Sequence, residues 1–314
     1  MRKTTSLRIY RKSMQNILLV LLGPTGVGKT NLSIEIASRL GCEIISCDSR
    51  QFYREMSIGT AVPSPIQMGA VKHHFIGFKS INEYYSASLF ERDVIELLPV
   101  LFIAGRTVIM TGGSGMYIDA VCKGFDDIPD TDPEIREKII RRYREEGIES
   151  LRVSLRMLDP DHYRVVDLRN AKRIIRALEI CETTGRPYSS FIKNKRTERD
   201  FRTVKIGLNR SREELFGMIN QRVDSMIGLG LEEEAMSLYE SRHLNALNTV
   251  GYREFFDFFE GRLTKEKAVE LIKRNTRRYA KRQMTWWARD KEITWFHPDR
   301  KQEILDFIKK EIEE

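Results

Sequence analysis

Residues 17–30, ILLVLLGPTGVGKT, constrain the fold more than any other stretch of the chain. Residues 17–22 form a short apolar run, which is typical of a buried parallel strand. The pattern Gly-x-x-x-x-Gly-Lys-Thr follows at once, and residues 31–40 carry apolar side chains at helical spacing. A strand, a glycine-rich loop and a helix in this order predict a loop whose N–H groups, together with the helix N-terminus, face a phosphate.

This loop predicts the binding of a di- or triphosphate together with Mg²⁺, the expected cofactor, but it does not define the reaction. Lys29 offers a point charge to the terminal phosphate, and Thr30 offers a hydroxyl to the metal. The predicted diphosphate-binding residues are Gly23, Pro24, Thr25, Gly26, Val27, Gly28, Lys29 and Thr30.

The 314 residues suffice for two domains, or for one domain with a large insertion. The net charge of +8 is a modest basic excess that does not by itself identify a partner. Four scattered cysteines show neither zinc-ligand spacing nor a disulfide framework, which favours the reducing cytoplasm. No apolar run reaches membrane-spanning length, so we expect no membrane partner. Residues 1–14 are predicted to be a flexible basic extension.

Two polar residues follow predicted strands. Asp48 comes directly after a strand predicted at 42–47, and Ser114 follows a strand predicted at 107–111. Ligands of open α/β sheets bind beyond the carboxyl ends of the strands, so Asp48 should lie near the phosphate loop. A turn or a helix cap is the alternative role for such an aspartate. No acidic residue follows the strand at 107–111, where many phosphate-loop ATPases place an aspartate that holds Mg²⁺. This absence argues against an ordinary ATPase.

The segment between these strands has two further features. Residues 56–66 contain a glycine and two prolines and are predicted to form a surface loop. His73 and His74 are adjacent, so in a strand they point to opposite faces. This favours a structural or substrate-contact role over metal ligation. Residues 84–98 then keep a helical period.

The character of the chain changes at residue 125, where FDDIPDTDPEIR brings two prolines and four aspartates. Helices are predicted at 134–147, 149–158 and 170–185, so residues 125–200 read as a mostly helical insertion. Residues 15–124 then form the first part of an α/β, phosphate-loop NTPase-like core with a parallel sheet. Residues 201–314 return to this core with a strand at 203–208, a helical C-terminal region (212–228, 231–239, 251–260 and 264–290), a last strand at 293–296 and a final helix.

The helix predicted at 264–290 contains a basic run. Six of the ten residues 273–282 are basic and none is acidic. Helical spacing aligns Arg274, Arg278 and Lys281 on one stripe and places Ala268, Leu271, Ile272, Tyr279 and Trp286 toward another. Such a run is often only a solvated face, but the missing acids and the following tryptophans favour contact with a polyanion.

Seven blocks occur in order along nearly the whole chain: GPTGVGKT, DSRQFYREMSIGTAVPS, HHF, TGGSGMYI, RNAKRIIRALE, VGYREF and RRYAKRQMTWW. Together they resemble the tRNA dimethylallyltransferase (tRNA isopentenyltransferase) family of bacterial type. The resemblance implies transfer of a dimethylallyl group from dimethylallyl diphosphate to the exocyclic amine of the adenosine 3′ of the anticodon, position 37. Two positions depart from the family pattern, since Val62 stands where lysine is more frequent and Ser114 where threonine is usual.

The resemblance also implies roles for individual residues. Asp48 would be the general base, Lys29 and Thr30 would act on the departing pyrophosphate, and Ser114 would bond the target base or Asp48. The anticodon stem-loop of tRNA would be the partner, partly through the insertion. The implied tRNA-binding residues are Asp48, Ser49, Arg50, Gln51, Ser114, Arg136, Lys172, Arg173, Ile174, Ile175, Arg176, Gly251, Tyr252 and Arg253, to which the basic stripe adds Arg274, Arg278 and Lys281.

Two other functions are compatible with the phosphate loop. A nucleotide or small-molecule kinase could use Asp48 as the base for a hydroxyl acceptor, but this leaves the basic helices unexplained. A non-catalytic RNA-binding NTPase would need a strand-end aspartate for Mg²⁺, and residues 108–111 offer none. We expect the protein to be a monomer.

Overall fold

A computed structural model describes residues 15–126, 128–129, 131–192 and 197–313, so the extension predicted at 1–14 lies outside it. The chain divides into two compact units. A core comprises the chain up to Cys122 and again from Arg199, and an insertion comprises Lys123–Glu198. The sequence placed the two boundaries at 125 and 200. No helix in the described ranges is both long and apolar enough to cross a membrane.

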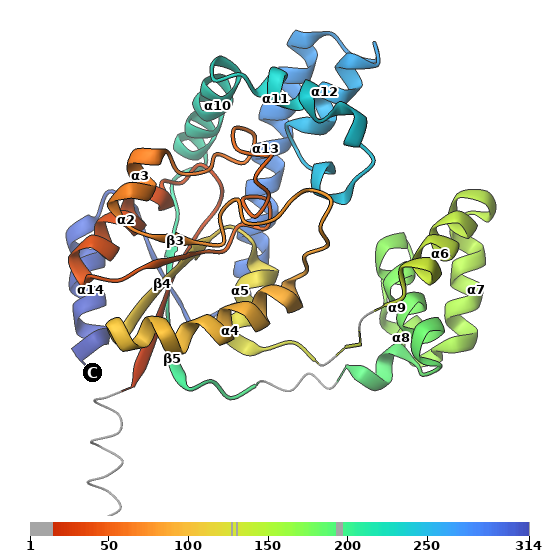
Figure 1. The fold of residues 1–314 in the computed structure, drawn as a ribbon, viewed down its shortest axis with the longest axis horizontal. Helices are drawn as coiled ribbons and strands as arrows, with labels where there is room; N and C mark the ends of the chain where they lie inside the picture. Colours follow the sequence, from red (N-terminus) through yellow and green to blue (C-terminus); the bar gives the residue numbers. More distant parts are fainter. Residues whose placement is uncertain (1–14, 127, 130, 193–196, 314) are drawn as a thin grey trace, which may run out of the picture. The chain divides into compact units, whose positions relative to one another are not determined.

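The core is built on a six-stranded sheet in which all neighbouring strands are parallel (Figure 1). The strand order β3-β2-β4-β1-β5-β6 puts β1 between β4 and β5, near the centre. The α/β class and the parallel sheet predicted from the sequence are confirmed. The strands are β1 (Asn16–Leu22), β2 (Ile44–Ser46), β3 (His73–His74), β4 (Thr107–Gly112), β5 (Phe201–Leu208) and β6 (Ile293–Phe296).

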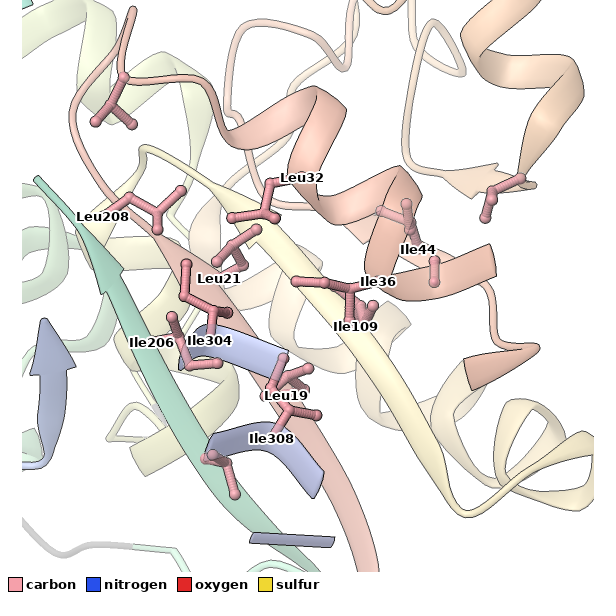
Figure 2. Close-up of a cluster of buried hydrophobic side chains, with 14 of the residues drawn as sticks. Leu19, Leu21, Leu32, Ile36, Ile44, Ile109, Ile206, Leu208, Ile304 and Ile308 are labelled. Atoms are coloured by element: carbon pink, nitrogen blue, oxygen red, sulfur yellow. The ribbon is translucent and has the colours of Figure 1, made fainter. Parts of the chain in front are cut away.

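Strand β1 is buried on both faces because its side chains alternate between two apolar clusters. Leu19 and Leu21 pack with side chains of α2 (Lys29–Leu40) and α14 (Lys301–Glu313), as Figure 2 shows. Leu18 and Val20 point to the other face, which α4 (Ala87–Ala104) and α5 (Gly115–Lys123) cover. A continuous apolar strand with helices on both sides is the expected environment at the centre of a parallel sheet.

Helices α3 and α4 differ from the sequence prediction. Helix α3 (Pro65–Ala70) begins inside the loop predicted at 56–66, because Ser64 and Gln67 form a capping box and Pro65 follows the cap. Met56, at the start of that loop, is fully buried rather than exposed. Helix α4 begins after Ser86, which accepts the N–H of Leu89, and continues past Pro99.

The remaining core helices are α10 (Arg212–Gly228), α11 (Leu231–Ser237), α12 (Tyr252–Phe259) and α13 (Lys265–Trp287), with short 3-10 turns at Tyr239–Ser241 and Asn245–Leu247. A third apolar cluster joins α10 to α13. On α13, Tyr279 and Trp286 share the predicted stripe with Ile272, yet they are 36% and 47% exposed. Ile272 packs in the third cluster and Trp287 against the sheet, so the buried face turns by about 60° along the helix.

The insertion has a small apolar core of its own. It contains α6 (Pro133–Glu146), α7 (Ile148–Leu158), α8 (Pro160–Val165), α9 (Ala171–Thr184) and a 3-10 turn at Tyr188–Phe191. Helix α8 was not predicted. Asp159 caps it and is fully buried, where it also accepts bonds from the N–H and hydroxyl of Ser189. At the ends of the insertion, the N–H of Thr197 donates to the carbonyl oxygen of Lys123 at 2.8 Å.

Candidate active site

The phosphate loop joins β1 to α2 and has the conformation that its glycines permit. Gly26 and Gly28 adopt φ angles of +81° and +108°, which side chains with a Cβ rarely tolerate. The ammonium group of Lys29 donates to the carbonyl oxygens of Gly23 at 2.8 Å and Pro24 at 2.9 Å. Helix α2 begins at Lys29, so its unpaired N–H groups face the space in front of the loop.

A cavity of about 640 Å³ lies in front of this loop. Five of the predicted diphosphate-binding residues line it, whereas Gly23, Pro24 and Val27 are buried behind the loop surface. The departure at Val62 places an apolar side chain in the cavity wall. The cavity is lined by Thr25, Gly26, Gly28, Lys29, Thr30, Asn31, Ser33, Ser46, Asp48, Gln51, Ala61, Val62, Pro63, Gln67, His73, Ile76, Thr111, Gly112, Gly113, Met218, Arg222, Ser225 and Gln283.

Two cations and one carboxylate face this cavity. Burial, and then the positive charge of Arg222, lower the pKa of Lys29 to about 7, while Asp48 opposes the shift. Burial also lowers the pKa of Arg222, again against the effect of Asp48. Within the described residues the Arg222 side chain has no hydrogen-bond or ion-pair partner. A polyanion such as a diphosphate would supply negative charge that balances these two cations.

Asp48 and Ser114 come from neighbouring strands and meet at Ser49. The hydroxyl of Ser114 accepts the N–H of Ser49 at 3.1 Å and lies 3.2 Å from the Ser49 hydroxyl. The Asp48 carboxylate accepts the N–H of Arg50 at 3.0 Å and lines the cavity, whereas Ser114 is buried beside it and does not. Asp48 therefore faces the phosphate loop with one carboxylate oxygen bound to its own turn.

Among the cavity residues that sequence reasoning missed, Arg222 and Gln283 contribute most to the site. Gln283 is buried, accepts the N–H of Thr25 at 2.9 Å and donates to the carbonyl oxygen of Gly113 at 2.7 Å. It thereby ties the phosphate loop to the turn that carries Ser114. Arg222 and Gln283 lie on α10 and α13, far along the chain from any phosphate motif. For α13, the sequence offered only the basic run at 273–282, which contains no acid, and the tryptophans that follow it.

The two histidines behave as the strand geometry predicted. His73 lies at the cavity, and its Nδ1 bonds the carbonyl oxygen of Val71 at 2.7 Å, while its buried Nε2 has no hydrogen-bond partner among the described residues. Burial lowers the pKa of His73. His74 instead pairs with Glu43. Their side chains therefore serve different surroundings.

The resemblance implies that several residues of the core bind tRNA. Some of these residues form contacts inside the core instead. Arg50 donates to the carbonyl oxygens of Asn245 and Ala246 at 3.0 and 2.9 Å. Gln51 lines the cavity. Gly251 and Tyr252 are buried and Tyr252 is fully so, which corrects the expectation that its side chain touches RNA. Arg253 is exposed.

The basic stripe of α13 is exposed at Arg274, Arg278 and Lys281. None of the three forms an ion pair with another described residue. In the insertion, Lys172 and Arg173 are also exposed. These five cations are thus available to a polyanion on the surfaces of their own units.

Other predicted contacts of the insertion are internal. Glu179 is fully buried; it accepts Arg136 at 2.7 Å and Arg176 at 3.5 Å. Ile174 and Ile175 are buried in the insertion core, so the expectation that their side chains contact tRNA is corrected. Arg136 and Arg176 remain partly exposed beside their ion pairs.

The oxygen donors of the cavity fit a magnesium ion held largely by its substrate. The Thr30 hydroxyl and the Asp48 carboxylate both line it. The described residues contain no group of three His, Cys, Asp or Glu side chains that could hold a metal alone. Mg²⁺ takes few protein ligands and completes its shell with phosphate oxygens and water, so the Thr30 hydroxyl beside a diphosphate site suffices.

Comparison with known proteins decides the family. A model of the IPP transferase family matches residues 51–290. The tRNA dimethylallyltransferase 2 of Parabacteroides distasonis is 56% identical over 95% of this chain and 99% of its own length. The chain belongs to the tRNA dimethylallyltransferase family. The tRNA dimethylallyltransferase 1 of Phocaeicola vulgatus is 53% identical over 94% of this chain and 98% of its own length.

Solved structures of this transferase family share the fold. The tRNA isopentenylpyrophosphate transferase of Bacillus halodurans aligns with a TM-score of 0.69 at 36% identity, covering 95% of this chain and 97% of that one. A eukaryotic dimethylallyltransferase acting on tRNA aligns with a TM-score of 0.75 at 26% identity, covering 90% and 74%. The similarity to other tRNA dimethylallyltransferases thus extends over both units of the chain.

Proposed function

We propose that this enzyme transfers the dimethylallyl group of dimethylallyl diphosphate to the exocyclic amine of the adenosine 3′ of the anticodon, position 37 of tRNA, and releases pyrophosphate. The carrying observation is the cavity itself, in which two cations and the phosphate loop face one carboxylate. Family membership favours prenyl transfer over the kinase alternative, because the relatives are named as transferases acting on tRNA.

The leaving-group side of the reaction belongs to the phosphate loop. As the C–O bond of the allylic diphosphate breaks, its electron pair passes to the pyrophosphate. Lys29, Arg222 and the N–H groups at the start of α2 would stabilise this charge. Bound Mg²⁺, for which Thr30 offers a hydroxyl ligand, would supply further Lewis-acid stabilisation.

The nucleophile side belongs to the turn after β2. The adenine amine is weakly basic because its lone pair is delocalised into the ring, so it must lose a proton as the C–N bond forms. Asp48 would accept that proton. Ser114, bonded to the Ser49 backbone, would fix the turn that carries this carboxylate. The target base must leave its stack to reach the cavity.

The exposed cations would hold the anticodon stem-loop. Phosphate contacts position an RNA without reading its sequence. Lys172 and Arg173 on the insertion and the basic stripe of α13 are suited to this role because none is paired to an acid among the described residues. A cytoplasmic location completes the proposal and is supported by the four free cysteines, which suit a reducing compartment. We also propose that the protein is a monomer.

The decisive measurement is product formation with the purified enzyme, bulk tRNA, Mg²⁺ and either dimethylallyl diphosphate or ATP. We expect pyrophosphate from the allylic substrate, tRNA-dependent and matched by a prenylated adenosine in mass spectra of digested tRNA. Release of ADP from ATP without prenylation would support the kinase instead. A cell lacking the protein should lose the same nucleoside.

A further inference from the structure

Glu234, in α11, accepts four hydrogen bonds, three of them from the segment that leads into the cavity wall. Its carboxylate accepts the backbone N–H groups of Ser57 at 2.9 Å, Ile58 at 2.8 Å and Gly59 at 2.8 Å. The same carboxylate accepts the phenolic hydroxyl of Tyr252 at 2.7 Å. Three successive N–H groups that converge on one carboxylate form a concave anion site, and bonds to a charged acceptor are stronger than neutral ones.

The wall that depends on this site is residues 57–63, which belong to no helix or strand. Within it, the N–H of Val62 donates to the Ser57 carbonyl at 3.1 Å, and Ala61 is held at a φ of +49°, which costs energy for a residue with a Cβ. Ala61, Val62 and Pro63 face the cavity. The position of these three residues therefore follows from how the preceding turn is held.

The turn is held from both sides. On the cavity side, the Gln51 amide donates to the carbonyl oxygens of Thr60 and Ala61, each at 3.1 Å. On the far side stand Glu234 and the buried Tyr252. A Cβ added to Gly59 would lie 2.6 Å from the Tyr252 hydroxyl oxygen, so only glycine fits between the turn and this ring.

We propose that Glu234 is a positioning residue that keeps the 57–63 wall in place for the diphosphate. The inference rests on the proposed function for its substrate. Glu234 itself does not line the cavity, so it acts through the turn it binds. Loss of its carboxylate leaves three backbone N–H groups without their acceptor and frees the wall. The diphosphate should bind less tightly, while the exposed cations that would meet tRNA are untouched.

The test compares Glu234→Gln with Glu233→Gln on the same helix, whose exposed carboxylate forms no hydrogen bond with the described residues of the turn. Glutamine keeps the volume but turns an NH₂ group toward N–H donors. We expect KM for dimethylallyl diphosphate to rise by about tenfold in Glu234→Gln, with kcat and KM for tRNA within about twofold. Amide exchange at Ser57, Ile58 and Gly59 should accelerate. Glu233→Gln should match the wild type in every readout.

Tyr252→Phe removes a single bond and keeps the ring, so it should give a smaller shift in the same direction and serves if Glu234→Gln does not fold. An unchanged KM for the diphosphate and unchanged exchange at residues 57–59 would overturn the proposal. An equal rise of KM for both substrates together with a lowered Tm would also overturn it, because this result indicates only a structural role. If the wild type releases no pyrophosphate, the proposed function fails, but the exchange rates still decide the positioning role.

Discussion

The cations of the core cavity and those of the insertion are held in different ways. Lys29 and Arg222 face a cavity where burial lowers the pKa of both, and Asp48 is the acid that opposes these shifts. In the insertion, Arg136 and Arg176 are already paired with the buried Glu179, and the unpaired cations lie on the surface. Charge that is buried and only partly balanced suits a small anion, whereas exposed charge suits a large, hydrated one.

The largest test of this difference removes the carboxylate from the cavity. Asp48→Ala should lower the single-turnover rate by about 10²-fold or more, the usual scale for a lost general base, because the amine can no longer pass on its proton. Binding of tRNA should stay within a few-fold, as judged by filter binding. A near-normal rate at saturating substrates would remove Asp48 from the mechanism.

Replacing a cavity cation should affect binding and chemistry together. Lys29→Met should weaken dimethylallyl diphosphate binding and lower kcat, because one charge serves both the bound and the departing pyrophosphate. Together these losses should lower kcat/KM by about 10²-fold, the usual scale for a lost electrostatic contact. Titration calorimetry and single-turnover kinetics measure the two parts. If ATP binding changed and prenyl transfer did not, the kinase hypothesis would regain support.

Exposed cations should respond to salt rather than alter the chemistry. Neutralising Arg274, Arg278 and Lys281 together should raise KM for tRNA and flatten its salt dependence by roughly 0.7 to 0.9 log units per lost contact, because fewer counterions are released. Affinity for dimethylallyl diphosphate should not change. An unaltered salt slope would show that the basic stripe of α13 is only a solvated face.

The smallest effect concerns His73, whose folded pKa lies below its ordinary value because of burial. As pH falls through about 6.5, the unfolded chain takes up this proton before the folded one does, so the wild type loses stability. His73→Gln should remove this loss, so that its free energy of unfolding falls less than that of the wild type between pH 7.5 and 5. Urea unfolding of both proteins measures it, and parallel pH profiles would contradict the assignment.

The sequence predicted the sheet and the long helices because their signals are local. Apolar runs end at phosphate-binding glycines or at Asp48, and amphipathic periods end at glycines. The short helices α3 and α8 were not predicted, because each depends on one capping turn rather than on a helical period of apolar residues. A single period cannot describe α13 either, because its buried face turns along its length.

The site residues that belong to a sequence motif were predictable, whereas those that only the folded chain brings to the cavity were not. The phosphate loop and Asp48 are contiguous with strands. Arg222 and Gln283 reach the cavity only because α10 and α13 pack beside it, which is a long-range consequence of tertiary structure. The family resemblance also did not predict that Tyr252 is buried. This residue was expected to contact RNA, but its hydroxyl donates a hydrogen bond inside the core.

The hydrogen bond between Thr197 and Lys123 shows that the two ends of the insertion lie next to each other. A segment with adjoining ends can be gained or lost without redirecting the strands on either side of it. An ancestral phosphate-loop protein could therefore have acquired the insertion in a single step. By the same logic, an engineer could close the core with a short glycine-containing linker, because joining ends that are already adjacent has a small entropic cost.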